Sequence, residues 1–139
     1  MKRFSKFQLP AILWAIAIFV ESSFSNLAPP PLGIDFSDKL AHAFVFGILG
    51  WLTTRAFINS DNKRLHARPI MFSILFCLLY GMSDEFHQYF VPGRVSDVYD
   101  FLADGLGVLV AQIPFFIILH RTSEKREVPN KQPNYEYDN

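Results

Sequence analysis

Four long stretches of the chain are dominated by apolar residues, and shorter polar segments separate them. The apolar stretches cover roughly residues 8–24, 38–58, 69–90 and 97–119. Each approaches or exceeds the roughly 17–25 residues that a helix needs to cross the hydrocarbon core of a bilayer. The pattern therefore predicts an all-α integral membrane bundle of four transmembrane helices, in a single domain that covers residues 1–120.

Prolines, glycines and polar residues set the expected boundaries. Three consecutive prolines at 29–31 forbid a helix between the first two stretches. Pro69 suits the first turn of the third helix, and Pro92-Gly93 is turn chemistry between the third and fourth. After residue 120 the chain becomes charged and poor in large aliphatic residues. Such a composition predicts a disordered cytoplasmic tail over residues 121–139.

The first apolar stretch has two interpretations. A basic leader, a short apolar run and small residues at 23–25 are the elements of a secretory signal peptide. Glu21 interrupts the approach to that cleavage site, which favours a retained transmembrane helix. The arrangement of the other three helices is the same in both cases.

The basic residues predict the orientation. Of the 13 Lys and Arg residues, only Lys39 and Arg94 fall on one side of the predicted membrane. The positive-inside rule therefore places both termini in the cytoplasm, N-in and C-in. Charged residues make up only 19% of the chain and the formal net charge is zero. Soluble proteins contain about 25% charged residues, so this chain has fewer than a soluble protein usually has. We therefore expect the lipid bilayer as its partner and no nucleic acid.

This topology brings the acids of the membrane segments to the outer end. Eight acids meet only two cations there, an excess that calls for protons, metal ions or a cationic partner. The acids are Glu21, Asp35, Asp38, Asp84, Glu85, Asp97, Asp100 and Asp104.

Asp84, Glu85 and Asp104 are the candidate catalytic residues, because local helix energetics do not explain them. Asp84 and Glu85 lie near a helix C-terminus, where negative charge opposes the helix dipole. Asp104 lies about two turns into an apolar helix, beyond the reach of capping. An unpaired charge at that depth costs about 2.5–3.5 kcal/mol on insertion scales.

Other polar residues at the same end are candidate binding residues. Asp97, Asp100 and Asp104 share one helix face at about 100° per residue. Asp38 and Asp97 also fit helix N-caps and Asp100 fits a first-turn acid, so these alternatives stay open. Arg94 is the expected counter-charge of the three catalytic candidates. The candidate binding residues are Asp38, Lys39, His42, His87, Gln88, Arg94, Asp97 and Asp100.

The motifs DKLAH (38–42), SDEFHQ (83–88), PGR (92–94) and SDVYDFLADGLG (96–107) stand in an order that resembles the VanZ-like family. These are small bacterial multi-pass membrane proteins, named after a protein associated with teicoplanin resistance. The resemblance implies four helices in the bacterial cytoplasmic membrane. Nothing in the sequence indicates glycopeptide binding, and the family pattern gives no role to His87. The family's polar positions fall on Asp38, Lys39, His42, Asp84, Glu85, Gln88, Arg94 and Asp100.

Three functions fit these residues. The first is a binding or accessory protein of the cell envelope, whose acidic outer site takes an envelope lipid, a cell-wall precursor or an antibiotic-like ligand. The second is an intramembrane hydrolase or transferase on a lipid-linked substrate, in which paired carboxylates divide acid and base roles. The third, less favoured, is a small proton-coupled transporter. No cofactor is predicted, although a divalent metal on Asp84, Glu85, Asp97, Asp100 or Asp104 would suit an oxygen-rich site.

Overall fold

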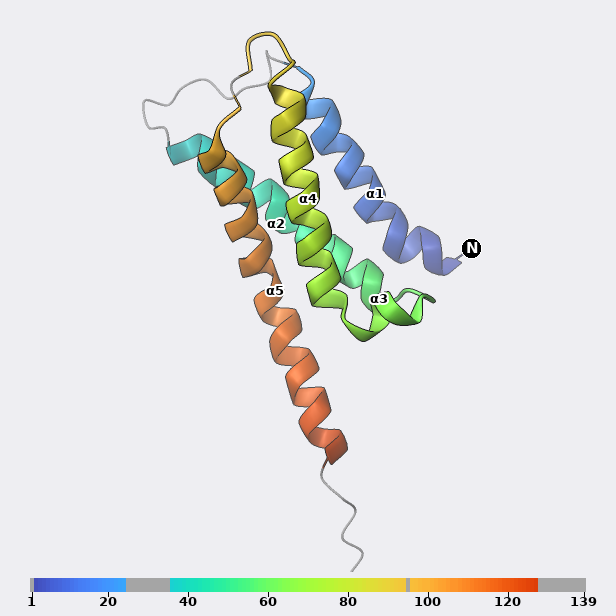
Figure 1. The fold of residues 1–139 in the computed structure, drawn as a ribbon. Helices are drawn as coiled ribbons and strands as arrows, with labels where there is room; N and C mark the ends of the chain where they lie inside the picture. The colour runs from blue at the N-terminus through green and yellow to red at the C-terminus, as the bar shows by residue number, and fades with distance from the viewer. Residues whose placement is uncertain (1, 25–35, 95, 128–139) are drawn as a thin grey trace, which may run out of the picture.

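The computed structural model describes residues 2–24, 36–94 and 96–127, and these fold into helices without a strand (Figure 1). The helices are α1 (Lys2–Ser22), α2 (Phe36–Ile58), α3 (Lys63–Ala67), α4 (Pro69–Gln88) and α5 (Val98–Glu127).

Four of these helices are long and apolar enough to cross a membrane. Large apolar side chains such as Phe44, Phe86 and Leu106 are exposed on their outer surfaces. Broad exposed apolar surfaces mark contact with a membrane or another protein. The all-α fold with four candidate spans is therefore confirmed. The spans are Arg3–Ser22, Asp38–Ile58, Pro69–Gln88 and Val98–Thr122.

Most helix ends lie within two residues of the sequence-based boundaries, and the larger differences are two helix ends and one additional helix. α1 begins at Lys2, before the expected start at residue 8, and α5 continues past residue 119 to Glu127. The short helix α3 lies in a segment where we expected only a loop, and the side chain of Asn62 caps it by accepting from two backbone N–H groups. The remainder of the predicted tail, 128–139, and the proline-containing segment 25–35, with Asp35, lie outside the described residues.

α2 is the central helix, because it packs against the other helices more extensively than any of them does. Its closest neighbour is α5: a Cβ atom added to Gly107 would lie only 1.9 Å from the carbonyl oxygen of Ala43. Small residues permit such backbone approach between membrane helices. The buried core beside this contact consists of Ile18, Phe46, Leu49, Cys77 and Val108.

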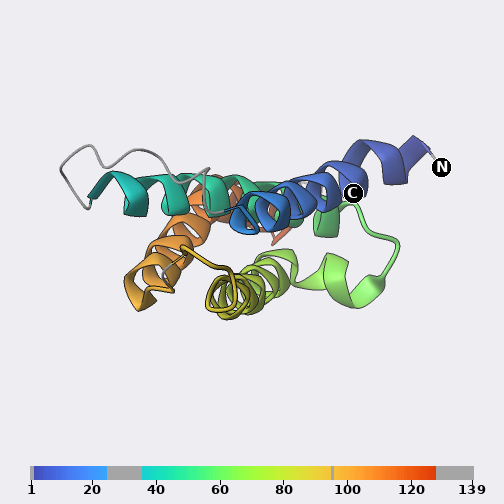
Figure 2. The ribbon, with the colours of Figure 1, turned by 90° about the horizontal axis from the view of Figure 1, so that it is seen from above.

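The chain direction alternates between the four long helices (Figure 1). The end of α1, the start of α2, the end of α4 and the start of α5 therefore gather at one end of the molecule, which we call the polar end. Seen from above, α4 and the first turns of α5 lie on the same side of α1 and α2 (Figure 2). This alternation brings together residues from widely separated parts of the sequence.

Candidate functional site

Lys39 joins the start of α2 to the start of α5 through two carboxylates. Its Nζ atom lies 3.0 Å from Asp97 Oδ2 and 2.8 Å from Asp100 Oδ1. Asp97 also acts as the cap of α5, because its Oδ1 accepts from the Tyr99 backbone N–H at 2.9 Å. The Tyr99 amide, with help from Lys39, holds the pKa of the Asp97 carboxyl below its ordinary value. Asp97 is therefore a helix cap and a partner of Lys39 at the same time.

His42 and Asp104 form the second contact between α2 and α5. The His42 Nδ1 atom lies 3.0 Å from Asp104 Oδ1, and the Asp104 side chain is almost completely buried. The other carboxylate oxygen, Asp104 Oδ2, has no hydrogen-bond partner in the part of the chain that the structure describes.

Asp84 and Glu85 are both buried but turn toward different partners. Asp84 Oδ2 accepts from Gln88 Nε2 at 3.1 Å, one turn further along α4. Glu85 Oε2 accepts from the Ser96 hydroxyl at 3.0 Å and from the Asp97 backbone N–H at 2.9 Å. Glu85 thereby ties α4 to the segment that precedes α5. Its second oxygen, Oε1, has no partner among the described residues.

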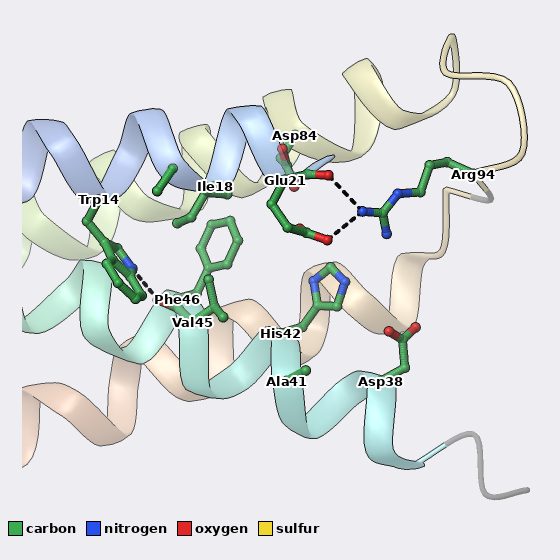
Figure 3. Close-up of a pocket in the computed structure, with 11 residues that line it drawn as sticks. Trp14, Ile18, Glu21, Asp38, Ala41, His42, Val45, Phe46, Asp84 and Arg94 are labelled. Atoms are coloured by element: carbon green, nitrogen blue, oxygen red, sulfur yellow. Dashed lines mark hydrogen bonds and ion pairs between the residues drawn. The ribbon is translucent and has the colours of Figure 1, made fainter. Parts of the chain in front are cut away.

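Arg94 does not pair with Asp84, Glu85 or Asp104, contrary to the sequence-based expectation. Its guanidinium donates to the side-chain and backbone oxygens of Glu21 on α1. The reason lies in the turn after α4, which carries Arg94 toward the end of α1 (Figure 3). The acid partner was detectable in principle, since Glu21 is the only acid on α1.

His87 also contacts α1. Its Nε2 atom lies 3.0 Å from the Ser23 hydroxyl, and its ring lies beside Phe19, with centroids 4.8 Å apart. Asp84 and Gln88 contact each other on α4, whereas His87 contacts the end of α1.

A cavity of about 250 Å³ lies between α1, α2 and α4 at the polar end (Figure 3). Part of its wall is apolar, with Trp14, Ile18 and Phe46 among the lining residues. Sequence patterns did not single out these apolar residues, because nothing distinguishes them from other membrane-facing positions. The polar part of the wall consists of Glu21, Asp38, His42, Asp84 and Arg94.

The polar end contains two groups of side chains that could hold a metal ion. In each group, one ligand atom from every residue lies within 4.8 Å of the others. His42 belongs to both groups, once with Asp38 and Asp100 and once with Glu85 and Asp104. Two of the residues predicted as metal ligands, Asp84 and Asp97, belong to neither group. The other candidate residues outside both groups are Lys39, His87, Gln88 and Arg94.

Comparisons with known proteins identify the family of this chain. The chain is 31% identical over 111 residues to the uncharacterised protein C11E3.10 of Schizosaccharomyces pombe, a match that covers 79% of this chain. The match spans 65% of the length of that relative. No solved structure matches this chain. The VanZ/LLP1 family matches residues 3–119, which include every candidate site residue. The chain therefore belongs to the VanZ/LLP1 family.

Proposed function

We propose that this protein binds an amphiphilic molecule of the cell envelope, a lipid or a lipid-linked precursor, in the cavity between α1, α2 and α4. The observation that carries the proposal is the division of the cavity wall into a polar and an apolar part. Ligand sites in proteins have this composition, with a few polar groups on an apolar surface. In a membrane helix bundle, an apolar wall suits a hydrocarbon chain and the polar end suits the head group.

The charges of the wall favour a head group that donates hydrogen bonds or carries positive charge. Asp38 and Asp84 line the cavity without an Arg or Lys partner, and the Arg94 guanidinium already binds Glu21. Lys39 binds Asp97 and Asp100, so it does not offset these two carboxylates. An amine would satisfy them, whereas a phosphate alone would meet like charge.

The environment and orientation are part of the same proposal. The polar end faces away from the cytoplasm, because the basic residues of the α2–α4 connection and of α5 lie at the opposite end. The bacterial cytoplasmic membrane is the location implied by the family resemblance. A similar protein in a fission yeast means that similarity alone does not specify this membrane. A topology reporter fused after Asn139 should report the cytoplasm, and a signal from the outside would reverse the assignment.

An intramembrane enzyme is the second candidate. The convergence of His42, Glu85 and Asp104 favours it, because a histidine beside two buried carboxylates is a donor set for acid–base or metal-assisted hydrolysis. The substrate would then be the same amphiphile, and its head group would be the part that reacts.

Lipid retention tests the binding proposal. The full-length protein is placed in nanodiscs that contain equal amounts of phosphatidylethanolamine and phosphatidylglycerol, and retained lipid is measured by native mass spectrometry after release into detergent. We expect phosphatidylethanolamine to be retained preferentially. Ala17→Phe, which fills the apolar part of the cavity, should abolish retention.

Ala111→Phe is the matched control, because Ala111 lies on α5 and does not line this cavity. Asp84→Asn should remove the preference for the amine head group while leaving some lipid bound. Equal retention by the wild type and Ala17→Phe would exclude the cavity as the binding site. A preference for phosphatidylglycerol would overturn the assignment of the head group.

A further inference from the structure

Three side chains from three helices converge beside the cavity: His42 of α2, Glu85 of α4 and Asp104 of α5. One ligand atom from each lies within 4.8 Å of the other two. The close backbone contact between Gly107 and Ala43 fixes α2 against α5 independently of these side chains. The convergence is therefore a consequence of how the helices cross.

Two carboxylate oxygens of this group are left over after the protein's own contacts are made. Glu85 Oε1 and Asp104 Oδ2 have no hydrogen-bond partner among the described residues. Glu85 is only 8% exposed and Asp104 only 2%. Buried polar atoms without partners are rare in proteins because they are costly. Gly81 leaves room at this point, since a Cβ atom there would lie 3.3 Å from Asp104 Oδ2.

The neighbouring basic side chains do not neutralise these oxygens. Lys39 is held by Asp97 and Asp100, and the Arg94 guanidinium is held by Glu21. A protonated His42 would supply one positive charge, and its Nδ1 atom already contacts the other oxygen of Asp104. Protons on the carboxyl groups or a metal cation bound between them could satisfy the two oxygens, and the convergence of a histidine nitrogen on the same point favours the metal.

The second group, Asp38 with His42 and Asp100, fits a metal less well. Asp100 Oδ1 already accepts from Lys39 at 2.8 Å, so its charge is offset within the protein. Asp38 lines the cavity and is only half-buried. Neither residue has an oxygen among the buried atoms without a partner.

We propose that His42, Glu85 and Asp104 together bind one divalent cation, Zn²⁺ or Mn²⁺. One imidazole nitrogen and two carboxylates form a mixed donor set of the kind these ions take. The ligand atoms are at most 4.8 Å apart, and metal–ligand distances of about 2.0–2.2 Å require them to move closer together when the ion binds. The Ser96 hydroxyl and the Asp97 backbone N–H donate to Glu85 Oε2. These hydrogen bonds fix the orientation of the carboxylate, so that Oε1 can face the ion.

The position of the site beside the cavity leaves one side open. His42 belongs to the cavity wall, whereas Glu85 and Asp104 lie behind it. A metal held by three protein ligands keeps a coordination position for water or for a ligand group. The cavity would supply access to that position.

The number of metal ions bound per chain tests the proposal directly. The full-length protein is purified in detergent without chelator, incubated with ZnCl₂ or MnCl₂, desalted and examined by elemental analysis. We expect about one bound ion per chain, as for a site with one complete donor set. Asp104→Asn and Glu85→Gln should each weaken binding at least ~10-fold. Glu21→Gln and Asp38→Asn should bind as the wild type does, since neither residue belongs to the proposed donor set.

Each contrary result excludes a part of the proposal. A wild-type protein without bound Zn²⁺ or Mn²⁺ after incubation would overturn it. Equal loss in Asp38→Asn and Asp104→Asn would place the ion in the other group. The cation site stands independently of amphiphile binding, because Ala17→Phe should abolish lipid retention and leave metal content unchanged.

Thermal unfolding in detergent gives a second measurement, which needs no elemental analysis of the variants. With a chelator present, Asp104→Asn should unfold at a higher temperature than the wild type, because it removes one of two neighbouring buried carboxylates and keeps a polar side chain beside His42. With metal in excess, the order should reverse, because only the wild type gains the stabilisation of a bound ion. The same order under both conditions would mean that the carboxylates are satisfied by protons or by the protein alone. If Asp104→Asn fails to fold, His42→Gln serves in the same comparison of the two conditions.

Discussion

The acids at the polar end fall into two groups that differ in how their charge is met. Asp97 and Asp100, at the start of α5, share the ammonium of Lys39 at 3.0 and 2.8 Å. Glu85 and Asp104 are both buried, and each keeps one oxygen without a partner in the described part of the chain. The chain supplies a lysine to both carboxylates of the first group, whereas in the second group His42 contacts only Asp104, through one oxygen.

This difference separates folding from function. The first group lies where helix energetics favour acids, at a cap and in a first helical turn, and it needs no further explanation. The second group opposes folding, because buried charge without a full set of partners is costly. A chain that retains such residues is expected to use them, and residues that break local rules mark functional sites.

The largest expected effect comes from removing the cation of the paired group. Lys39→Met keeps the length of the side chain but leaves Asp97 and Asp100 without a counter-charge. We expect a loss of about 1–2 kcal/mol in the free energy of unfolding, below the value for a fully buried pair because this one is partly solvated. Denaturant unfolding in detergent, followed by circular dichroism, measures it. The Lys39 side chain is 27% exposed, so solvent screens the ion pairs and lowers their expected contribution.

Asp100→Asn provides the control for that result. In the Lys39→Met background it removes the more buried of the two stranded carboxylates and should restore part of the lost stability. If Lys39→Met were neutral, the paired group would not differ energetically from the unpaired one, and the contrast between them would fail.

The fold was predictable because the length and spacing of the apolar stretches determine most of it. Long apolar stretches must be helical in a bilayer to satisfy their backbone hydrogen bonds, and four such stretches place their ends alternately on two sides. The gathering of Glu21, Asp84 and Asp104 at one end follows from this alternation alone. α3 was missed because its short polar sequence has no apolar face, and only the capping Asn62 signals it.

The pairing of side chains was not predictable in the same way. The sequence indicated that Arg94 would meet an acid, but the turn after α4 determines which one, and it directs the side chain to Glu21. Lys39 reaches across to Asp97 and Asp100 only because α2 and α5 cross closely at Gly107. Helical spacing places residues on faces, whereas the crossing of the helices decides which faces meet. The cavity likewise depends on this crossing.

The Arg94–Glu21 pair allows a smaller test of the same contrast. Glu21 is half exposed, with 52% of its side chain accessible, so the pair is expected to contribute about 0.5 kcal/mol. Arg94→Gln and Glu21→Gln should lower the free energy of unfolding by similar amounts, and the double variant should lose little more than either one. A double-mutant cycle in detergent measures this coupling.

Metal content distinguishes the two possible roles of Arg94. If Arg94 neutralised Glu85 or Asp104, Arg94→Gln would change the affinity for Zn²⁺ or Mn²⁺. We expect no change, because Arg94 contacts neither residue. A shift in affinity together with strict additivity in the cycle would mean that Arg94 acts on the unpaired acids after all.

The smallest expected effect is the dependence of stability on pH at Asp97. The Tyr99 amide and Lys39 hold the pKa of this carboxyl below its ordinary value in the folded protein. A lowered pKa means that the folded state binds the proton less readily than the unfolded state does. The resulting stabilisation is complete above the unfolded pKa and is lost as the pH falls through the folded pKa.

Asp97→Asn isolates the charge, because Asn caps a helix about as well as Asp does. The wild type should therefore exceed Asp97→Asn in stability at neutral pH, and the two should converge in acid as the carboxyl is protonated. A constant difference at all pH values would assign the contribution of Asp97 to its cap hydrogen bond alone, and the Lys39 contact would then add nothing to the paired group.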